Sequence, residues 1–196
     1  MRLKARAFLG LALLILSSGC AGLFGWDIHA PGRLSKEFSQ TVQPVPERIA
    51  LYLPPEVLHY ESREKGGWSA DPQTFHVGEA LAPMLVEGFQ DGFQEFIFLE
   101  VEPTPAVLHR YGIPRTAVVR VKEFGNRVTL KGQALTLVTE TVILDPDLKP
   151  LARFESRGVS DAQKVFSKKG GPEVNLNAAI EQNVFATIQQ IREWKP

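Results

Sequence analysis

The chain has very little cysteine, no excess of either charge and no apolar run long enough to cross a bilayer. Its single cysteine, Cys20, excludes an internal disulfide and the paired cysteines of the common zinc motifs. Twenty-two basic residues balance 22 acidic ones, which argues against the clustered positive charge that nucleic-acid binding needs. The hydrophobic content of 44% is typical of a globular protein, and a chain of this length can bury a core without disulfides.

Motifs for catalysis and cofactor binding are also missing. The sequence contains no G-x-S-x-G, no P-loop and no G-x-G-x-x-G, which are the commonest signatures of a nucleophile elbow or a phosphate-binding loop. Its four histidines lie far apart, without the spacing of metal ligands: His29, His59, His76 and His109. Asp145 and Asp147 flank a proline, a pattern typical of a turn. We therefore expect no catalytic residue, no cofactor, no metal site and no enzyme activity.

The beginning of the chain has the features of an export signal. Three basic residues come first, and an apolar run from Ala7 to Leu16 follows. At 1.5 Å per residue this run extends over only ~15 Å, half of a bilayer core of ~30 Å. Small residues then lead to Cys20 in the sequence LSSGC. A positive start, a short apolar run and a small-residue site predict a secretory signal peptide over residues 1–19.

The LSSGC segment resembles the lipobox of bacterial lipoproteins. The resemblance implies that the sulfur of Cys20 receives a diacylglyceryl group and that the chain is cleaved just before this residue. A sulfur held in a thioether is neither a nucleophile nor a metal ligand, so Cys20 would be a membrane anchor. Ala21, rather than Asp, follows the cysteine, and by the same resemblance this implies the outer membrane and its periplasmic face. The alternative is an ordinary signal peptide in which Cys20 is incidental.

The residues after the anchor divide into two parts by composition. Residues 20–46 are rich in glycine and proline with little periodicity, which predicts a lipid-anchored tether with an extended reach of ~80 Å. Residues 47–196 are predicted to form a single periplasmic domain.

Hydrophobic periodicity indicates how this domain folds. Alternation at residues 49–53 predicts a strand, and apolar residues spaced by three and four predict helices over 77–96 and 175–194. Further strands are expected at 97–102 and, three times, within 116–159, with hairpin turns at residues 125–126 and 145–147. Residues 59–74 read as a loop. The predicted class is α+β, with a mainly antiparallel sheet of about five strands covered by two helices.

This order of elements behind a lipobox is similar to that of small envelope-assembly lipoproteins, such as the lipopolysaccharide-assembly family LptE. The resemblance implies a non-enzymatic, lipid-anchored protein that supports envelope assembly or transport by binding an envelope protein partner. It implies contact with the membrane through Cys20 and no contact with nucleic acid. The alternative is a periplasmic domain that binds a small apolar or lipid ligand between the sheet and the helices.

Overall fold

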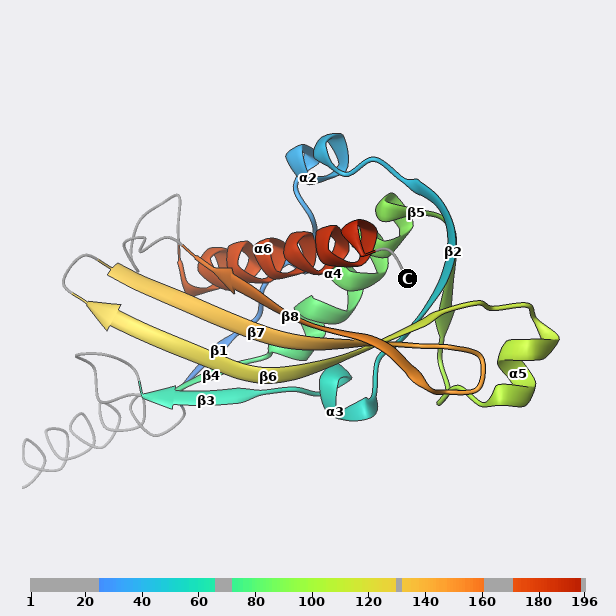
Figure 1. Ribbon diagram of the computed structural model, residues 1–196. Coiled ribbons are helices and arrows are strands. Elements are labelled where there is room, and N and C mark those ends of the chain that lie inside the picture. Colours follow the sequence, from blue (N-terminus) through green and yellow to red (C-terminus); the bar gives the residue numbers. More distant parts are fainter. Residues whose placement is uncertain (1–24, 66–71, 130–131, 161–170, 195–196) are drawn as a thin grey trace, which may run out of the picture.

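A computed structural model describes residues 25–65, 72–129, 132–160 and 171–194 of the chain. It confirms the α+β class, with a five-stranded sheet and two long helices packed against it (Figure 1). A second, three-stranded sheet lies beside the larger one. None of the described helices is long and apolar enough to cross a membrane.

The larger sheet has the strand order β5-β2-β6-β7-β8. The ladders of β6 with β7 and of β7 with β8 are antiparallel, whereas β2 pairs in parallel with both β5 and β6. A helix or a longer connection must therefore join β2 to each of these neighbours, and α4 makes the crossover from β2 to β5. The strands are β2 (Val45–Tyr52), β5 (Phe93–Leu99), β6 (Thr116–Thr129), β7 (Gly132–Leu144) and β8 (Pro150–Val159).

The long helices, α4 (Val77–Gly92) and α6 (Pro172–Glu193), cover one face of this sheet and also contact each other. As the helical period predicts, α6 buries one continuous apolar stripe: Leu176, Ile180, Val184, Ile188 and Ile191. The helices approach closely because α4 has glycine at the crossing. A methyl group on Gly88 would lie 2.6 Å from a Val184 side-chain carbon.

Several element boundaries differ from those expected. The helix predicted over 77–96 ends at Gly92, and β5 begins at the next residue. No turn occurs at Gly125, because β6 continues through it and pairs it with Thr136 of β7. The last helix begins at Pro172, whose fixed backbone angle suits a first helical position. The turn at residues 145–147 is confirmed, and the Leu148 amide donates to the Asp145 carbonyl oxygen.

The three-stranded sheet was not expected from the sequence. Its order is β1-β4-β3, and its strands are β1 (Trp26–Ile28), β4 (Pro72–Phe75) and β3 (Ser62–Lys65). Strands β3 and β4 occupy part of the predicted loop over 59–74. They are only four residues long, and such short strands give too few alternations to be recognised by period.

The segment interpreted as a tether also differs from expectation. Residues 26–46 contain β1, the helix α2 (Lys36–Thr41) and the start of β2. Ile28, Phe38 and Val42 are buried in the main core. The expectation of a free tether over 20–46 is therefore wrong for its described part. Burial of even isolated apolar side chains stabilises the folded state, also in a segment rich in glycine and proline.

Two short helices complete the fold, α3 (Pro55–Leu58) before β3 and α5 (Pro105–Arg110) between β5 and β6. The three-stranded sheet lies toward one end of the molecule, which we call the β1 end, and α5 lies at the opposite end, the α5 end (Figure 1). At the α5 end, a small second core forms on Ala50, Leu108 and Ile113.

Candidate functional site

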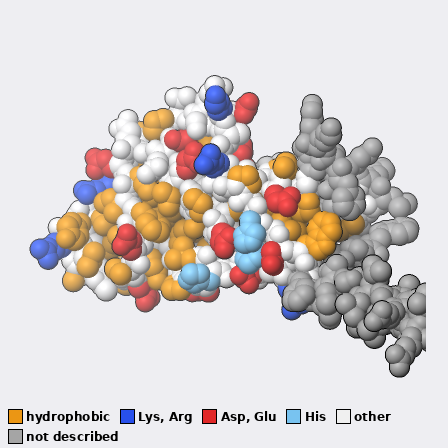
Figure 2. All heavy atoms as spheres, turned by 180° about the vertical axis from the view of Figure 1, so that it is seen from behind, with side chains coloured by type: hydrophobic (Ala, Val, Ile, Leu, Met, Phe, Trp, Pro, Cys, Tyr) orange, Lys and Arg blue, Asp and Glu red, His pale blue; other side chains and the backbone are white. Residues whose placement is uncertain are grey.

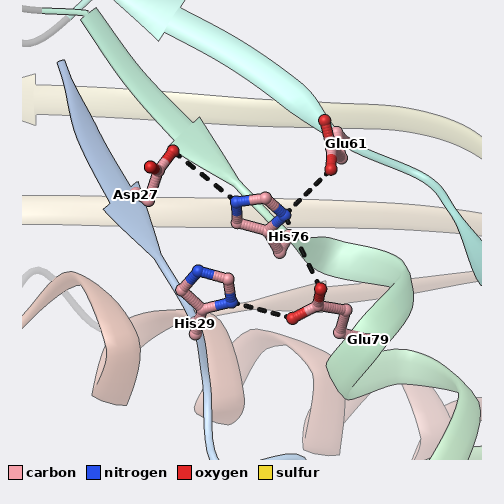
Figure 3. A network of polar contacts seen from close by, with 5 residues as sticks. All are labelled: Asp27, His29, Glu61, His76 and Glu79. Atoms are coloured by element: carbon pink, nitrogen blue, oxygen red, sulfur yellow. Dashed lines mark hydrogen bonds and ion pairs between the residues drawn. The ribbon is translucent and has the colours of Figure 1, made fainter. Parts of the chain in front are cut away.

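Two histidines and three carboxylates gather at the β1 end, where β1, β3 and β4 meet the start of α4 (Figure 3). We call this group the histidine–carboxylate cluster. Its members are Asp27, His29, Glu61, His76 and Glu79.

Strand register brings these residues together. In the parallel ladder of β1 and β4, Ile28 lies opposite Phe75, so the next residue of each chain segment, His29 and His76, leaves the sheet at the same point. The amide of His76 donates to the carbonyl oxygen of Ile28, which fixes this exit. In the antiparallel ladder of β3 and β4, Ser62 lies opposite Phe75. Glu61, just before β3, therefore reaches His76.

Glu79 comes from the first turn of α4, where a carboxylate is favoured by the helix dipole. Its Oε2 lies 2.8 Å from Nδ1 of His29, and its Oε1 lies 3.8 Å from Nδ1 of His76. The same Nδ1 atom of His76 lies 2.9 Å from Oε1 of Glu61, and Nε2 lies 3.6 Å from Oδ1 of Asp27. The two imidazole rings stack, with centroids 4.0 Å apart and planes inclined by 8°.

The charges of the cluster are unevenly matched. Among the described residues, no Lys or Arg forms an ion pair with Asp27, Glu61 or Glu79, so the two imidazoles are their ion-pair partners. The hydrogen bond with His29 lowers the pKa of the Glu79 carboxyl below its usual value of 4.5. With both histidines neutral, three negative charges lie together, which favours binding of a cation.

His76 is the most enclosed member, with a side chain only 15% exposed. Both of its ring nitrogens are buried, and neither makes a hydrogen bond of acceptable geometry. A neutral imidazole presents one N–H donor and one lone pair, so either tautomer leaves polar groups unsatisfied here. Buried polar atoms without a partner point to a proton, an ion or a ligand that satisfies them.

Sequence spacing gave no sign of this cluster. The distance of His29 from His76 in the sequence predicts no shared site, and this prediction is wrong for the pair because β1 pairs with β4. The one local signal was His76 three residues before Glu79 at a helix start, the spacing that places two side chains on one helix face. The other histidines lie elsewhere: His59 is exposed after α3, and His109 pairs with Asp147 at the α5 end.

Other residues singled out in the sequence have structural roles. Asp145 accepts hydrogen bonds from the amides of Asp147 and Lys149, which confirms its part in the turn. The hydroxyl of Ser160 accepts a hydrogen bond from the amide of Leu135 and ties the end of β8 to β7. Cys20, the predicted lipidation site, lies outside the described residues.

The α5 end carries the second notable surface. Hydrophobic side chains gather there in the space-filling view (toward the left of Figure 2). Val101 is 71% and Tyr111 57% exposed. The exposed large hydrophobic residues of this end, which we call the distal apolar residues, are Phe98, Val101, Val107, Tyr111 and Leu151.

No protein-family model and no curated protein matches this chain. Solved structures with a similar course include lipoprotein GNA1162 from Neisseria meningitidis, at 13% identity over 76% of this chain and 100% of that one, with a TM-score of 0.39. The hypothetical protein CT253 from Chlamydia trachomatis is 9% identical over 76% of this chain and 96% of that one, with a TM-score of 0.42. PelC from Paraburkholderia phytofirmans is 12% identical over 74% of this chain and 92% of that one, with a TM-score of 0.35. At these identities and scores the matches assign no function to this chain.

Proposed function

We propose that this chain is a non-enzymatic lipoprotein, anchored through Cys20 to the periplasmic face of the outer membrane, that supports envelope assembly or transport by binding a protein partner at its α5 end. The observation that carries the proposal is the position of the distal apolar residues. They lie at the end of the domain opposite β1, and the chain from Cys20 enters the domain at β1.

The length of chain between anchor and domain supports this orientation. Five residues lie between Cys20 and Trp26, the first residue of β1, so the six steps from one Cα to the next, at ~3.4 Å each, extend over at most about 20 Å. An anchor at Cys20 would hold the β1 end close to the bilayer, where the predicted free tether would have allowed ~80 Å. The α5 end would then point away from the membrane surface.

The exposed apolar side chains favour a protein partner. Large exposed apolar patches on a soluble domain mark interaction sites, and β5 is an edge strand whose outer side has no neighbour in the described sheet. Phe98 lies on this edge strand, and Tyr111 closes the neighbouring helix α5. Aromatic residues of this kind are enriched where protein partners bind.

The alternative of an apolar ligand between sheet and helices gains no support from the packing there. Leu81, Met84 and Leu85 of α4 are completely buried, as are Leu135 and Leu137 of β7. A shallow hollow of ≈ 440 Å³ does occur between α2 and α6, with Phe38 and Phe185 in its wall, but it opens on the outer side of the helices.

A photo-crosslinking residue placed in the full chain in cells tests the partner surface. At position 101 we expect a discrete adduct with an envelope protein. Val174 is the matched control, because it is also an exposed valine but lies in the first turn of α6, away from α5. Equal adducts at both positions, or none at position 101, would contradict the proposal.

The anchor needs its own measurement. Cys20→Ser removes the only sulfur that a diacylglyceryl group can modify, so incorporation of labelled palmitate should disappear. Palmitate labelling at the wild-type level in this variant would exclude Cys20 as the anchor.

A further inference from the structure

The histidine–carboxylate cluster contains several atoms that can bind a metal ion, and some of them lack a hydrogen-bond partner within the cluster. One ligand atom from each of His29, His76 and Glu79 lies within 4.8 Å of the other two. Glu61 is already 2.9 Å from Nδ1 of His76 and can supply a fourth atom. Zinc is commonly bound by three such ligands, with the fourth position open or filled by a carboxylate.

The donor types select among cations. Mg²⁺ and Ca²⁺ prefer sites built only from oxygen, whereas imidazole nitrogens mixed with carboxylates suit Zn²⁺ and neighbouring transition metals. The three carboxylates supply the negative charge that such an ion neutralises. The two buried ring nitrogens of His76, which lack acceptable hydrogen bonds, are the second observation that points to a bound ion.

The stacking of the His29 and His76 rings means that one ring must move before both can bind the same ion. A metal ion lies close to the plane of each imidazole that binds it, so two rings stacked face to face, with centroids 4.0 Å apart, cannot share one ion. His76 is held in place by its buried position, whereas His29 is 54% exposed and can turn about its side-chain bonds. Binding of one ion by both imidazoles therefore requires His29 to leave the stack.

We infer that His29, His76 and Glu79, completed by Glu61, bind one divalent ion of the zinc class. The ion joins the residue that follows β1 to the first turn of α4. Because β1 is the first described strand after Cys20, the ion would fasten the segment that leads to the anchor onto the folded domain. This inference does not depend on the partner proposed for the α5 end.

Calorimetric titration with ZnCl₂ tests the site. The protein is the full chain carrying Cys20→Ser, stripped with a chelator and kept in detergent, so that no thiol competes for zinc. We expect one ion per chain with a Kd of about micromolar or tighter, and a melting temperature that rises with zinc. MgCl₂ in place of ZnCl₂ should produce neither effect.

Conservative variants locate the ligands. His29→Gln and Glu79→Gln change exposed side chains, so the fold should persist, and each should weaken zinc binding at least about tenfold, since even the loss of an outer partner of a ligand costs that much. His109→Gln is the matched control: His109 and Asp147 are 2.9 Å apart and 58% and 56% exposed, like the pair of His29 and Glu79, but no second imidazole of the described residues stacks on His109. This control should bind zinc as the parent does.

Two results would overturn the inference. One is zinc binding that is absent, or that His29→Gln and Glu79→Gln leave unchanged while circular dichroism shows a folded chain. The other is stability that depends on pH through the histidine range but does not respond to zinc, because the cluster would then bind only protons.

Discussion

The two ends of this molecule each pair a histidine with a carboxylate, at 2.8 Å for His29 and Glu79 and at 2.9 Å for His109 and Asp147. At the α5 end the pair lies on the surface, and no second imidazole stacks on His109 among the described residues. At the β1 end a second imidazole stacks on the first, and two further carboxylates approach it.

A histidine–carboxylate pair by itself is therefore no sign of a binding site. What distinguishes the β1 end is that three separate segments of the chain, residues 27–29, 61 and 76–79, bring their side chains together, and that the His76 side chain is largely buried. The α5 end has instead exposed apolar side chains and a simple surface ion pair. One end has the features of an ion site, and the other has those of a contact surface.

Helix α6 runs along the sheet that extends between the two ends, and its apolar stripe packs on that sheet. Ile188→Asp would place an unpaired charge where the side chain is fully buried, so we expect a loss of about 4 kcal/mol or more in the free energy of unfolding. Val174→Asp makes a similar change at an exposed position in the first turn and should leave the melting temperature nearly unchanged. An unshifted thermal midpoint in Ile188→Asp would show that the stripe is not core.

Apolar residues at the two ends should differ in their effect on stability. Ile28→Ala, in β1, empties a buried core position and should cost about 2–5 kcal/mol in chemical denaturation. Val101→Ala, at the α5 end, changes an exposed side chain and should stay within about 0.5 kcal/mol. Equal denaturation midpoints for the two variants would mean that β1 is not part of the core.

Glycine-to-alanine substitutions at the two ends should also differ in their cost in stability, for different physical reasons. A methyl group on Gly78, beside the cluster, would lie 2.6 Å from the carbonyl oxygen of Leu58 and still closer to that of Val57, so Gly78→Ala should cost about 1–3 kcal/mol. At Gly112, after α5, a methyl group would meet only the end of the Arg48 side chain, at 3.9 Å, but the φ is +58°, so Gly112→Ala should cost only about 1 kcal/mol. Thermal melts measure both. A larger loss for Gly112→Ala would contradict the close approach at Gly78.

The smallest effect concerns titration at the α5 end. The hydrogen bond with His109 lowers the pKa of the Asp147 carboxyl below its usual 3.8. Because the folded-state pKa is lowered, the stability that this carboxylate contributes is present above its unfolded pKa and is lost as the pH falls through the lowered value. In His109→Ala the pKa of Asp147 should rise toward its usual value, as a carbon-13 NMR titration of the carboxyl would show. An unchanged titration would mean that the ion pair does not form in solution.

Long periodic segments made most of the fold predictable. The apolar stripe of α6 and the alternation in β7 each extend over enough residues to identify the element and its buried side, which was sufficient for the α+β class. The pairing of the strands was harder to predict from the sequence. Gly125 and Asn126 look locally like a turn, but the ladder between β6 and β7 continues through them because the longer pairing satisfies more backbone groups.

Neighbouring residues and their period were sufficient to identify the short apolar run before Cys20, the two long helices and the hairpin that turns at residues 145–147, but not the longer hairpin of β6 and β7. Only the tertiary structure decided that Ile28 and Phe38 belong to the core and that His29 meets His76. Those contacts depend on strands of three and four residues and on the six-residue helix α2, whose packing is set by burial against distant parts of the chain. A short strand has too little pattern of its own to reveal its partner, so the candidate site appears only when the chain is folded.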